Sequence, residues 1–230
     1  GTMKLAGGGL KVQRFKFDRR FDPESSPGGA ADLLFDLVTS EEFSHSLELG
    51  LGVTPESWTQ LEVEKLSATV LNMGFFDPLE SEGLLAPNGF LRKCMNDRVH
   101  GVDIDTLVTD MLLNEESEHA HIYGEAQRNE FLFRLFQLLF IGGAMHQRDE
   151  DVLAYLEQTK LLYKDLMTVH KRSATGKVEI TSRVYAVRPT ATGRCTALFP
   201  GTVELSHCYI IVDAAKKLAT AVHMPYKGFW

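Results

Sequence analysis

Hydrophobic residues are concentrated in one stretch of the chain, Asn129 to Ile141, which reads NEFLFRLFQLLFI. After Asn129 its polar residues are Glu130, Arg134 and Gln137, spaced four and three apart, which places them on one narrow strip of a helix. A helix that is apolar around most of its circumference must be buried by other elements. A membrane span needs about 20 apolar residues, whereas this run is shorter and carries Arg134. The pattern therefore predicts a buried core helix.

A second amphipathic helix is predicted shortly after the central one. Gly142-Gly143 supplies residues that commonly end a helix, and Asp149-Glu150-Asp151 places acids where the next helix begins. Positions of one helical face then recur at intervals of three and four. They are Val152, Tyr155, Leu156, Thr159, Leu162, Tyr163 and Leu166. We expect the two helices to pack as an antiparallel pair.

Shorter patterns fill the chain before the central helix. They predict, in chain order, a strand at Lys11–Phe17, a loop at Asp22–Gly29, a helix at Ala30–Val38, a cap at Ser40, a strand at Ala68–Leu71, a new element after Asp77-Pro78, a turn at Pro87-Asn88-Gly89 and a helix at Ile104–Leu113. Asp103 or Asp105 lies near the N-terminus of that last helix, where a carboxylate suits the helix dipole.

The end of the chain changes to the alternating pattern of strands. Thr168–His170 and Val178–Val187 flank the polar turn Lys171–Lys177, and Val178, Ile180, Val184 and Ala186 would share one face. A further hairpin is predicted from Tyr209–Val212 and Leu218–Met224. The fold class is therefore α+β, with a central buried helix pair, a C-terminal antiparallel sheet of hairpins, and mixed strands and helices at the N-terminal end. We expect residues 1–9 to be a cloning scar and flexible leader, and residues 10–230 to form a single domain.

Composition narrows the class of protein without naming it. The 230 residues are 44% hydrophobic and 24% charged, which is typical of a globular chain able to bury a core. A net charge of −7, with acids and bases interspersed, argues against a nucleic-acid-binding face or a polybasic membrane surface. Cys94, Cys195 and Cys208 are odd in number and widely spaced, so they favour a reducing compartment over a disulfide framework.

His119 and His121 are the best candidates for metal ligands in the sequence. In a strand, His119 and His121 would lie on the same face, as two imidazole ligands require, with Glu115 or Asp110 as a possible third ligand. The alternative is a solvated polar loop with two incidental histidines, because no local third ligand has a recognisable spacing. On the first interpretation the protein would be a small metal- or ligand-binding α+β domain or an enzyme that uses these two histidines.

Other motifs of catalysis are incomplete. Thr175-Gly176-Lys177 resembles the end of a phosphate-binding loop, but the first glycine is absent and Val178 replaces the magnesium-binding Ser or Thr. Cys94, near Arg92 and Lys93, could be an activated nucleophile, although a half-buried structural cysteine is the favoured interpretation. The sequence therefore gives no catalytic or cofactor-binding residue. Lys171, Arg172 and Lys177 could bind an acidic partner surface, or form a solvated hairpin tip.

Several segments together resemble one known family. They are Glu130-Phe131-Leu132-Phe133, Gly142-Gly143-Ala144, the run from Tyr155 to Leu166, Val178–Ser182 and Tyr209–Asp213. In these segments the chain resembles the cilia- and flagella-associated protein 300 family. The similarity covers most of the chain from about Lys11 onward, and the segments Asp22–Leu66 and Pro189–Leu205 depart from the family's pattern.

The resemblance implies a non-catalytic protein of motile cilia and flagella, located in the cytoplasm and at the axoneme. It implies a role in cytoplasmic assembly and intraflagellar transport of the outer and inner dynein arms, through protein–protein interaction. The partners implied are dynein preassembly factors, dynein arm components and the intraflagellar transport machinery. No cofactor and no catalytic residue are implied. An exposed edge of the last hairpin, or Phe229-Trp230, could dock such a partner.

Overall fold

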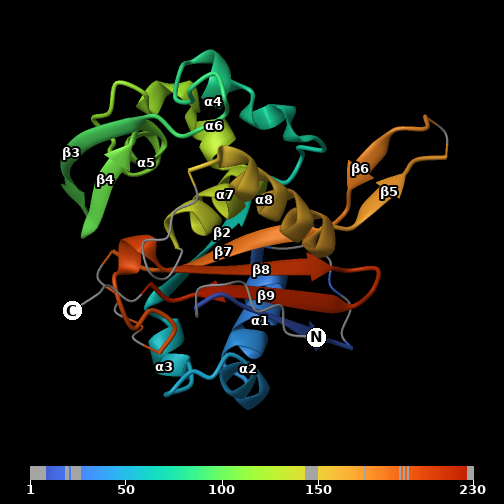
Figure 1. Cartoon of the computed structure of the whole chain (residues 1–230). Helices are drawn as coiled ribbons and strands as arrows, with labels where there is room; N and C mark the ends of the chain where they lie inside the picture. Colours follow the sequence, from blue (N-terminus) through green and yellow to red (C-terminus); the bar gives the residue numbers. More distant parts are fainter. Residues whose placement is uncertain are drawn as a thin grey trace. The chain divides into compact units, whose positions relative to one another are not determined.

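The computed structural model describes residues 9–18, 21, 27–142, 150–173, 175–191, 193, 195 and 197–226 (Figure 1). The chain divides into two compact units, one formed by Gly1–Leu66 with Met167–Trp230 and the other by Ser67–Leu166. The fold is α+β, as predicted. The grouping of residues 10–230 as a single domain stays a prediction. Within the described residues, no helix combines the length and the apolar character that a membrane span requires.

The first unit is built on a five-stranded antiparallel sheet. Its strands, in spatial order, are β1 (Lys11–Lys16), β9 (Leu218–Met224), β8 (His207–Asp213), β7 (Arg183–Pro189) and β2 (Leu61–Leu66). The predicted C-terminal hairpin is confirmed as β8 and β9, which lie in the interior of the sheet and are buried along nearly their whole length. The two edges of the sheet come from the N-terminal part of the chain.

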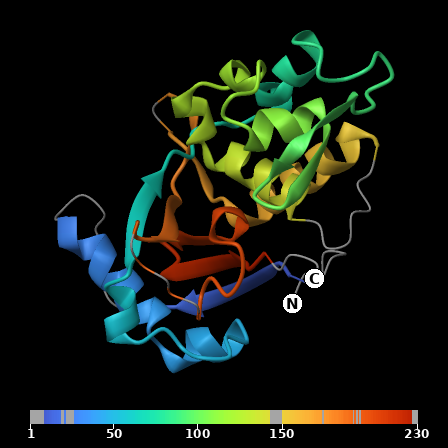
Figure 2. The ribbon, with the colours of Figure 1, turned by 90° about the vertical axis from the view of Figure 1, so that its left-hand side faces the viewer.

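Short helices provide the other half of this unit's core. They are α1 (Pro27–Val38), α2 (Glu41–Ser46) and α3 (Pro55–Trp58). The 3-10 turn η3 (Val203–Leu205) precedes β8. Leu34, Val38 and Phe43 form one hydrophobic core with Tyr185 and Ile210 of the sheet. Figure 2 shows these blue helices beside the sheet. The cap predicted at Ser40 is confirmed, since its hydroxyl accepts a hydrogen bond from the amide of Phe43 at 3.1 Å.

The second unit is mostly helical. Its elements are η1 (Met73–Phe76), α4 (Pro78–Ser81), β3 (Lys93–Val99), β4 (Val102–Thr106), α5 (Leu107–Leu113), η2 (Ala120–Ile122), α6 (Glu125–Arg128), α7 (Phe131–Ile141) and α8 (Val152–Leu166). The central helix is confirmed as α7, whose apolar residues other than Leu139 are buried. Phe140 contacts Tyr155 with ring centroids 4.6 Å apart, and Phe131 contacts Tyr163 at 6.1 Å. Opposite ends of α7 and α8 therefore meet, so the predicted antiparallel pair is also confirmed.

Two predictions in the middle of the chain are wrong in their extent. Ala68–Leu71 is not a strand, because β2 ends at Leu66 and Ser67 then pairs with Glu130 at the start of α7. The helix predicted at Ile104–Leu113 begins only at Leu107, after strand β4. Its N-cap is Thr106, whose hydroxyl accepts from the amide of Thr109 at 3.2 Å, and Asp105 is the residue before this cap.

Two boundaries near the ends of the chain also differ from the prediction. Val178–Val187 is two strands, β6 (Val178–Ile180) and β7, interrupted at Ser182, whose hydroxyl accepts from the amide of Thr168. Strand β6 pairs with β5 (Val169–Lys171) in a separate two-stranded sheet, so Val178 and Ile180 do not share a face with Val184. Pro27–Gly29 belongs to α1, since proline is well suited to a first helical turn. Residues 22–26 of the predicted loop lie outside the described residues.

Candidate functional site

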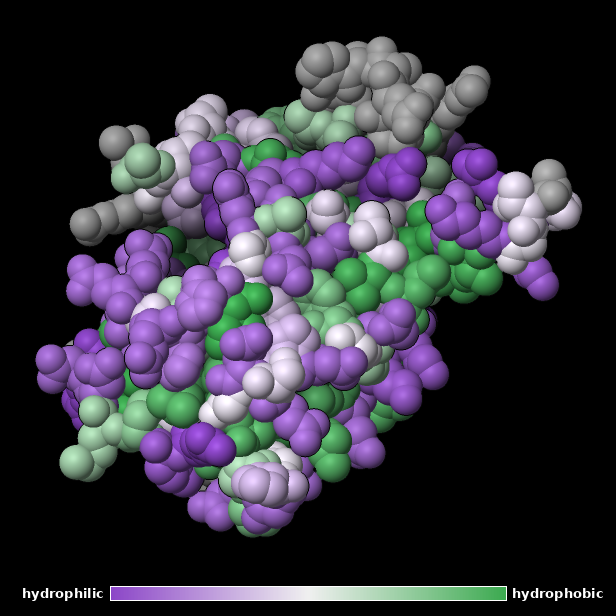
Figure 3. All heavy atoms as spheres, turned by 90° about the horizontal axis from the view of Figure 1, so that it is seen from above, coloured by the Kyte–Doolittle hydropathy of each residue, from purple (hydrophilic) through white to green (hydrophobic). Residues whose placement is uncertain are grey.

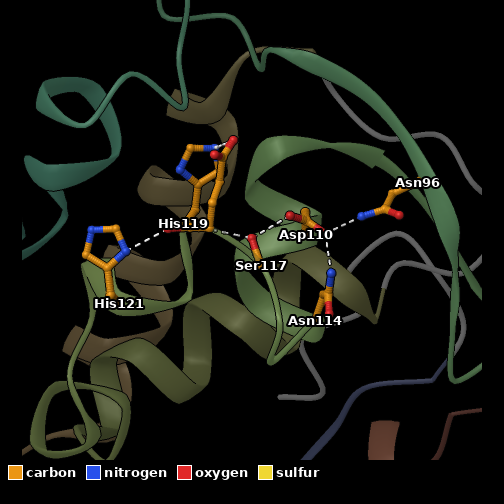
Figure 4. Close-up of polar contacts among 7 residues, drawn as sticks. Asn96, Asp110, Asn114, Ser117, His119 and His121 are labelled. Atoms are coloured by element: carbon orange, nitrogen blue, oxygen red, sulfur yellow. Dashed lines mark hydrogen bonds and ion pairs between the residues drawn. The ribbon is translucent and has the colours of Figure 1, made fainter.

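The two candidate metal ligands lie at a 3-10 turn instead of in a strand (Figure 4). His119 is the N-cap residue of η2, and His121 lies within it. The Nδ1 of His121 donates to the carbonyl oxygen of Glu118 at 2.7 Å, and the Nε2 of His119 lies 3.5 Å from the Glu118 carboxylate. Across the described part of the chain, no three His, Cys, Asp or Glu side chains gather in a way that could hold a metal ion. The assignment of His119 and His121 as ligands stays a prediction.

Beside this turn, Asp110 collects hydrogen bonds from three directions (Figure 4). Its carboxylate accepts from the side-chain amides of Asn96 at 3.0 Å and Asn114 at 2.9 Å, and from the hydroxyl of Ser117. Burial alone would raise the pKa of Asp110, but these three donors and the nearby His119 together lower it. The carboxylate is therefore ionised and fully engaged. It ties β3, the end of α5 and the following turn together.

Cys94 does not have the surroundings of an activated nucleophile. The thiol is partly buried on β3, and this burial raises its pKa, as do the negative charges of Asp110 and Asp105. Lys93 forms an ion pair with Glu150 at 3.5 Å. A nucleophilic cysteine needs a lowered pKa, which positive neighbours would supply. The structure thus favours the interpretation of Cys94 as a structural residue.

Arg128 is a central residue that sequence reasoning missed. Its Nε donates to the carbonyl of Tyr123 at 3.0 Å, and its Nη2 donates to the carbonyls of Met111 and Ala120, both at 2.9 Å. The guanidinium also lies over the ring of Phe133, 5.6 Å from the centroid. Burial, followed by the charge of Arg134, lowers its pKa. The side chain satisfies carbonyls at the ends of α5 and η2, so its role is to join three segments of the unit.

Glu130 has a similar joining role at the start of α7. The residue is 8% exposed, and its carboxylate accepts hydrogen bonds from the amide of Thr69 at 3.0 Å and the hydroxyl of Thr69 at 2.6 Å. The amide of Phe131 donates to the carbonyl of Ser67 at 2.8 Å. A hydrogen bond from a backbone amide to a carboxylate is charge-assisted, so it is stronger than a hydrogen bond between two neutral groups. The polar residue at the head of the apolar run therefore anchors the segment that follows β2.

The remaining motifs serve turns or fall outside the described residues. Gly176 adopts a φ of +68°, and the amide of Arg172 donates to the carbonyl of Lys177 at 2.9 Å, closing the hairpin. Thr175-Gly176-Lys177 is thus part of a hairpin turn and does not lead into a helix, as a phosphate-binding loop would. Phe229-Trp230 lies outside the described residues.

Comparison with known proteins identifies the family. The family model described as cilia- and flagella-associated protein 300 matches residues 5–224. The chain belongs to the cilia- and flagella-associated protein 300 family. This result confirms the resemblance found in the sequence, and the match includes both Arg128 and Glu130.

Two relatives with the name of this family are similar to the chain over most of its length. The protein of that name from Chlamydomonas reinhardtii is 31% identical over 207 residues, which cover 86% of this chain and 80% of the relative. The one from Paramecium tetraurelia is 30% identical over 221 residues, 96% of this chain and 84% of the relative. No solved structure matches the chain. Members of the family are associated with cilia and flagella, so this chain is a cilium- and flagellum-associated protein.

Proposed function

We propose that this protein is a non-catalytic factor in the assembly of outer and inner axonemal dynein arms. It acts through protein–protein contacts, first in the cytoplasm with preassembly factors and then with the intraflagellar transport machinery that carries arm components to the axoneme. The observation that carries the proposal is the family match over residues 5–224.

The polar side chains of the second unit support an interaction role over a catalytic one. Asp110 is engaged by three hydrogen-bond donors, and the guanidinium of Arg128 is occupied by three backbone carbonyls. A catalytic acid, base or electrophile must reach a substrate atom, usually at 2.6–3.2 Å. The carboxylate of Asp110 and the guanidinium of Arg128 are engaged in hydrogen bonds within the protein, so they stabilise the fold.

The test is recovery of partners from the cytoplasm of ciliated cells. The full-length protein carrying an affinity tag is purified and the retained proteins are identified by mass spectrometry, with the tag alone as the negative control and a known assembly factor as the positive control. We expect axonemal dynein chains together with assembly or transport factors. Recovery of none of them, while the positive control retains them, would overturn the proposal.

A fractionation experiment separates an assembly factor from a permanent part of the axoneme. An assembly factor is expected mostly in the cytoplasmic and soluble flagellar fractions. A structural component would stay with demembranated axonemes through extraction at high salt. Retention of most of the protein in the extracted axonemes would therefore argue against assembly as its main role.

A further inference from the structure

The hairpin of β5 and β6 stands apart from the five-stranded sheet of its own unit (Figure 1). Each strand has three residues, and every residue of β5 is exposed. A two-stranded hairpin without further support is marginally stable in water. Among the residues that the structure describes, no third strand joins this sheet. Both of its edges are therefore open to another strand.

One face of the hairpin combines Val169, Val178 and Ile180 with Lys171. The register pairs Val169 with Ile180 and Lys171 with Val178, and residues paired or two apart on a strand share a face. Val169 is 53% exposed and Val178 is 38% exposed, which is high for β-branched residues in a strand. Figure 3 shows hydrophobic residues beside hydrophilic ones on the right-hand side of the view, where this hairpin lies in Figure 1. The face offers apolar contact to a partner side chain.

The backbone of β5 presents hydrogen-bonding groups at its outer edge. The backbone amide of Arg172 donates to the carbonyl of Lys177, and the backbone amide of Thr181 donates to the carbonyl of Thr168, both at 2.9 Å. Bonded and non-bonded pairs alternate in an antiparallel ladder, so Val169 and Lys171 direct their N–H and C=O groups away from β6. These groups form the pattern onto which an added strand can bond.

Charge distinguishes the β5 edge from the β6 edge. The hairpin carries Lys171, Arg172 and Lys177 against the single acid Glu179, within a chain of net charge −7. Glu179 lies 2.9 Å from Arg172 and 4.0 Å from Lys177, so it compensates the charges on the β6 side and at the turn. Lys171, which shares a face with Val169, forms no ion pair with the described residues. The β5 edge is therefore basic.

We propose that β5 binds an extended acidic segment of a protein partner, which adds to the hairpin as a third strand. An apolar side chain of the segment lies against Val169 and Val178, and a carboxylate two residues along the segment lies on the same face, near Lys171. A second copy of β5 would place another Lys171 on the same face, so repulsion between the two lysines disfavours self-pairing. The inference rests on the proposed function only in requiring a protein as the partner.

A peptide selection tests the proposal. A displayed library of short random peptides is selected on the purified full-length protein, and selected peptides are synthesised and titrated. We expect sequences in which an acidic residue lies two positions from an apolar one. K171P removes one outward N–H without touching the β5–β6 hydrogen bonds and places a ring at the docking edge, so affinity should fall about tenfold or more.

The hairpin itself offers the matched control. K171A removes the same side-chain charge as K171P but keeps the outward N–H, so it should weaken binding clearly less than K171P does. K171E should weaken binding, whereas K160E on the exposed face of α8 makes the same change of charge without effect. Circular dichroism and thermal unfolding verify that every variant is folded.

Three results would overturn the proposal. They are a selection that yields no binders, selected peptides without acidic residues, and equal weakening by K171P and K171A. A dimer in sedimentation analysis that K171P dissociates would instead assign the edge to a second copy. Loss of peptide binding in K171P with unchanged recovery of dynein chains supports the hairpin and places dynein contacts elsewhere, so the two proposals can fail separately.

Discussion

At the scale of single residues, His223 shows how burial sets the charge of a side chain. It lies on β9 with 2% of its surface exposed, and its Nε2 donates to the carbonyl of Leu198 at 2.7 Å. The Nδ1 is buried and has no hydrogen-bond partner among the described residues. Burial lowers the pKa of His223 from 6.5 to about 4, with the charge of Lys11 contributing. The folded protein therefore keeps this imidazole neutral.

The protein should lose stability in mild acid because of His223. Between pH 6.5 and about 4 the unfolded chain binds a proton that the folded protein does not, so the free energy of unfolding falls as the pH falls. From pH 7.5 to 5 the loss should be about 2 kcal/mol. Urea denaturation at both pH values measures it. His223→Gln, which cannot titrate, should show a smaller loss by about that amount, and an equal loss in both proteins would contradict the prediction.

Asp110 should be sensitive to loss of charge even when its shape is kept. In Asp110→Asn an amide group replaces one acceptor oxygen and faces donors from Asn96, Asn114 or Ser117. We expect a loss of about 1–3 kcal/mol in the free energy of unfolding. Asp97→Asn makes the same change at an exposed carboxylate on β3, next to Asn96, and should cost little. Equal losses in the two variants would attribute the effect to net charge alone.

The site around Asp110 was only partly predictable. Its acidity and its closeness in sequence to His119 suggested a metal ligand, since Asp and His are common ligand types. The actual partners come from β3, which precedes Asp110 by 14 residues, and from the turn up to 7 residues after it. The fold of β3, α5 and the following turn brings these partners to Asp110. The spacing of residues in the sequence does not predict such an arrangement.

At the scale of elements, the link between Glu130 and Thr69 explains why a predicted strand is absent. Ala68–Leu71 is rich in β-branched residues, but its local preference amounts to a weak bias. Two hydrogen bonds from Thr69 to the Glu130 carboxylate, together with the Ser67 bridge, hold this segment against the start of α7 instead. Tertiary contacts therefore decide its conformation.

A double-mutant cycle should reveal this link. Thr69→Val removes the hydroxyl that donates to Glu130, and Glu130→Ala removes the acceptor for both bonds. We expect a coupling energy of about 1–2 kcal/mol from urea denaturation of the four proteins. Thr69→Val combined with Glu80→Ala, an exposed residue of α4, should be additive within about 0.5 kcal/mol. Additivity in the Glu130 cycle as well would show that the hydroxyl contributes nothing through Glu130.

Elements with long regular patterns were predictable and short ones were not. The apolar positions of α7 and α8 repeat over three turns or more, so the spacing identifies a helix without tertiary information. In Val102–Leu113 a five-residue strand leads directly into a seven-residue helix. Each pattern is too short to be distinguished from its neighbour, and the true boundary is the cap at Thr106.

At the scale of the whole molecule, the order of the sheet was beyond sequence reasoning. The hairpin β8–β9 joins neighbouring strands, and such pairings are expected from the chain order. The edges are different, because β1 pairs with β9 across about 200 residues and β2 pairs with β7 across about 120. The local patterns of Lys11–Lys16 and Leu61–Leu66 do not predict which distant strand each of them pairs with.

The chain passes from one compact unit to the other twice, after Leu66 and after Leu166, and neither passage contains a linker segment. Leu66 is the last residue of β2, and the next residue, Ser67, is already bonded to Asn129 and Phe131 of the second unit. Leu166 is the last residue of α8. The amide of Thr168 donates to the hydroxyl of Ser182, and the hydroxyl of Thr168 donates to the carboxylate of Asp213 at 2.6 Å. Domains that unfold independently are usually joined by exposed, flexible segments with few contacts. We therefore propose that the chain unfolds as the single domain predicted from its sequence.

Tryptophan fluorescence can test this cooperativity. Trp58 belongs to the first unit and packs against Phe35 with ring centroids 5.7 Å apart, so in a Trp230→Phe variant its emission reports on that unit alone. Far-UV circular dichroism includes the long helices α7 and α8 of the second unit. A single cooperative transition requires the two signals to have the same midpoint in urea and to give the same free energy of unfolding. Separate midpoints, with fluorescence following only one of two steps in ellipticity, would show that Ser67–Leu166 unfolds as a domain of its own.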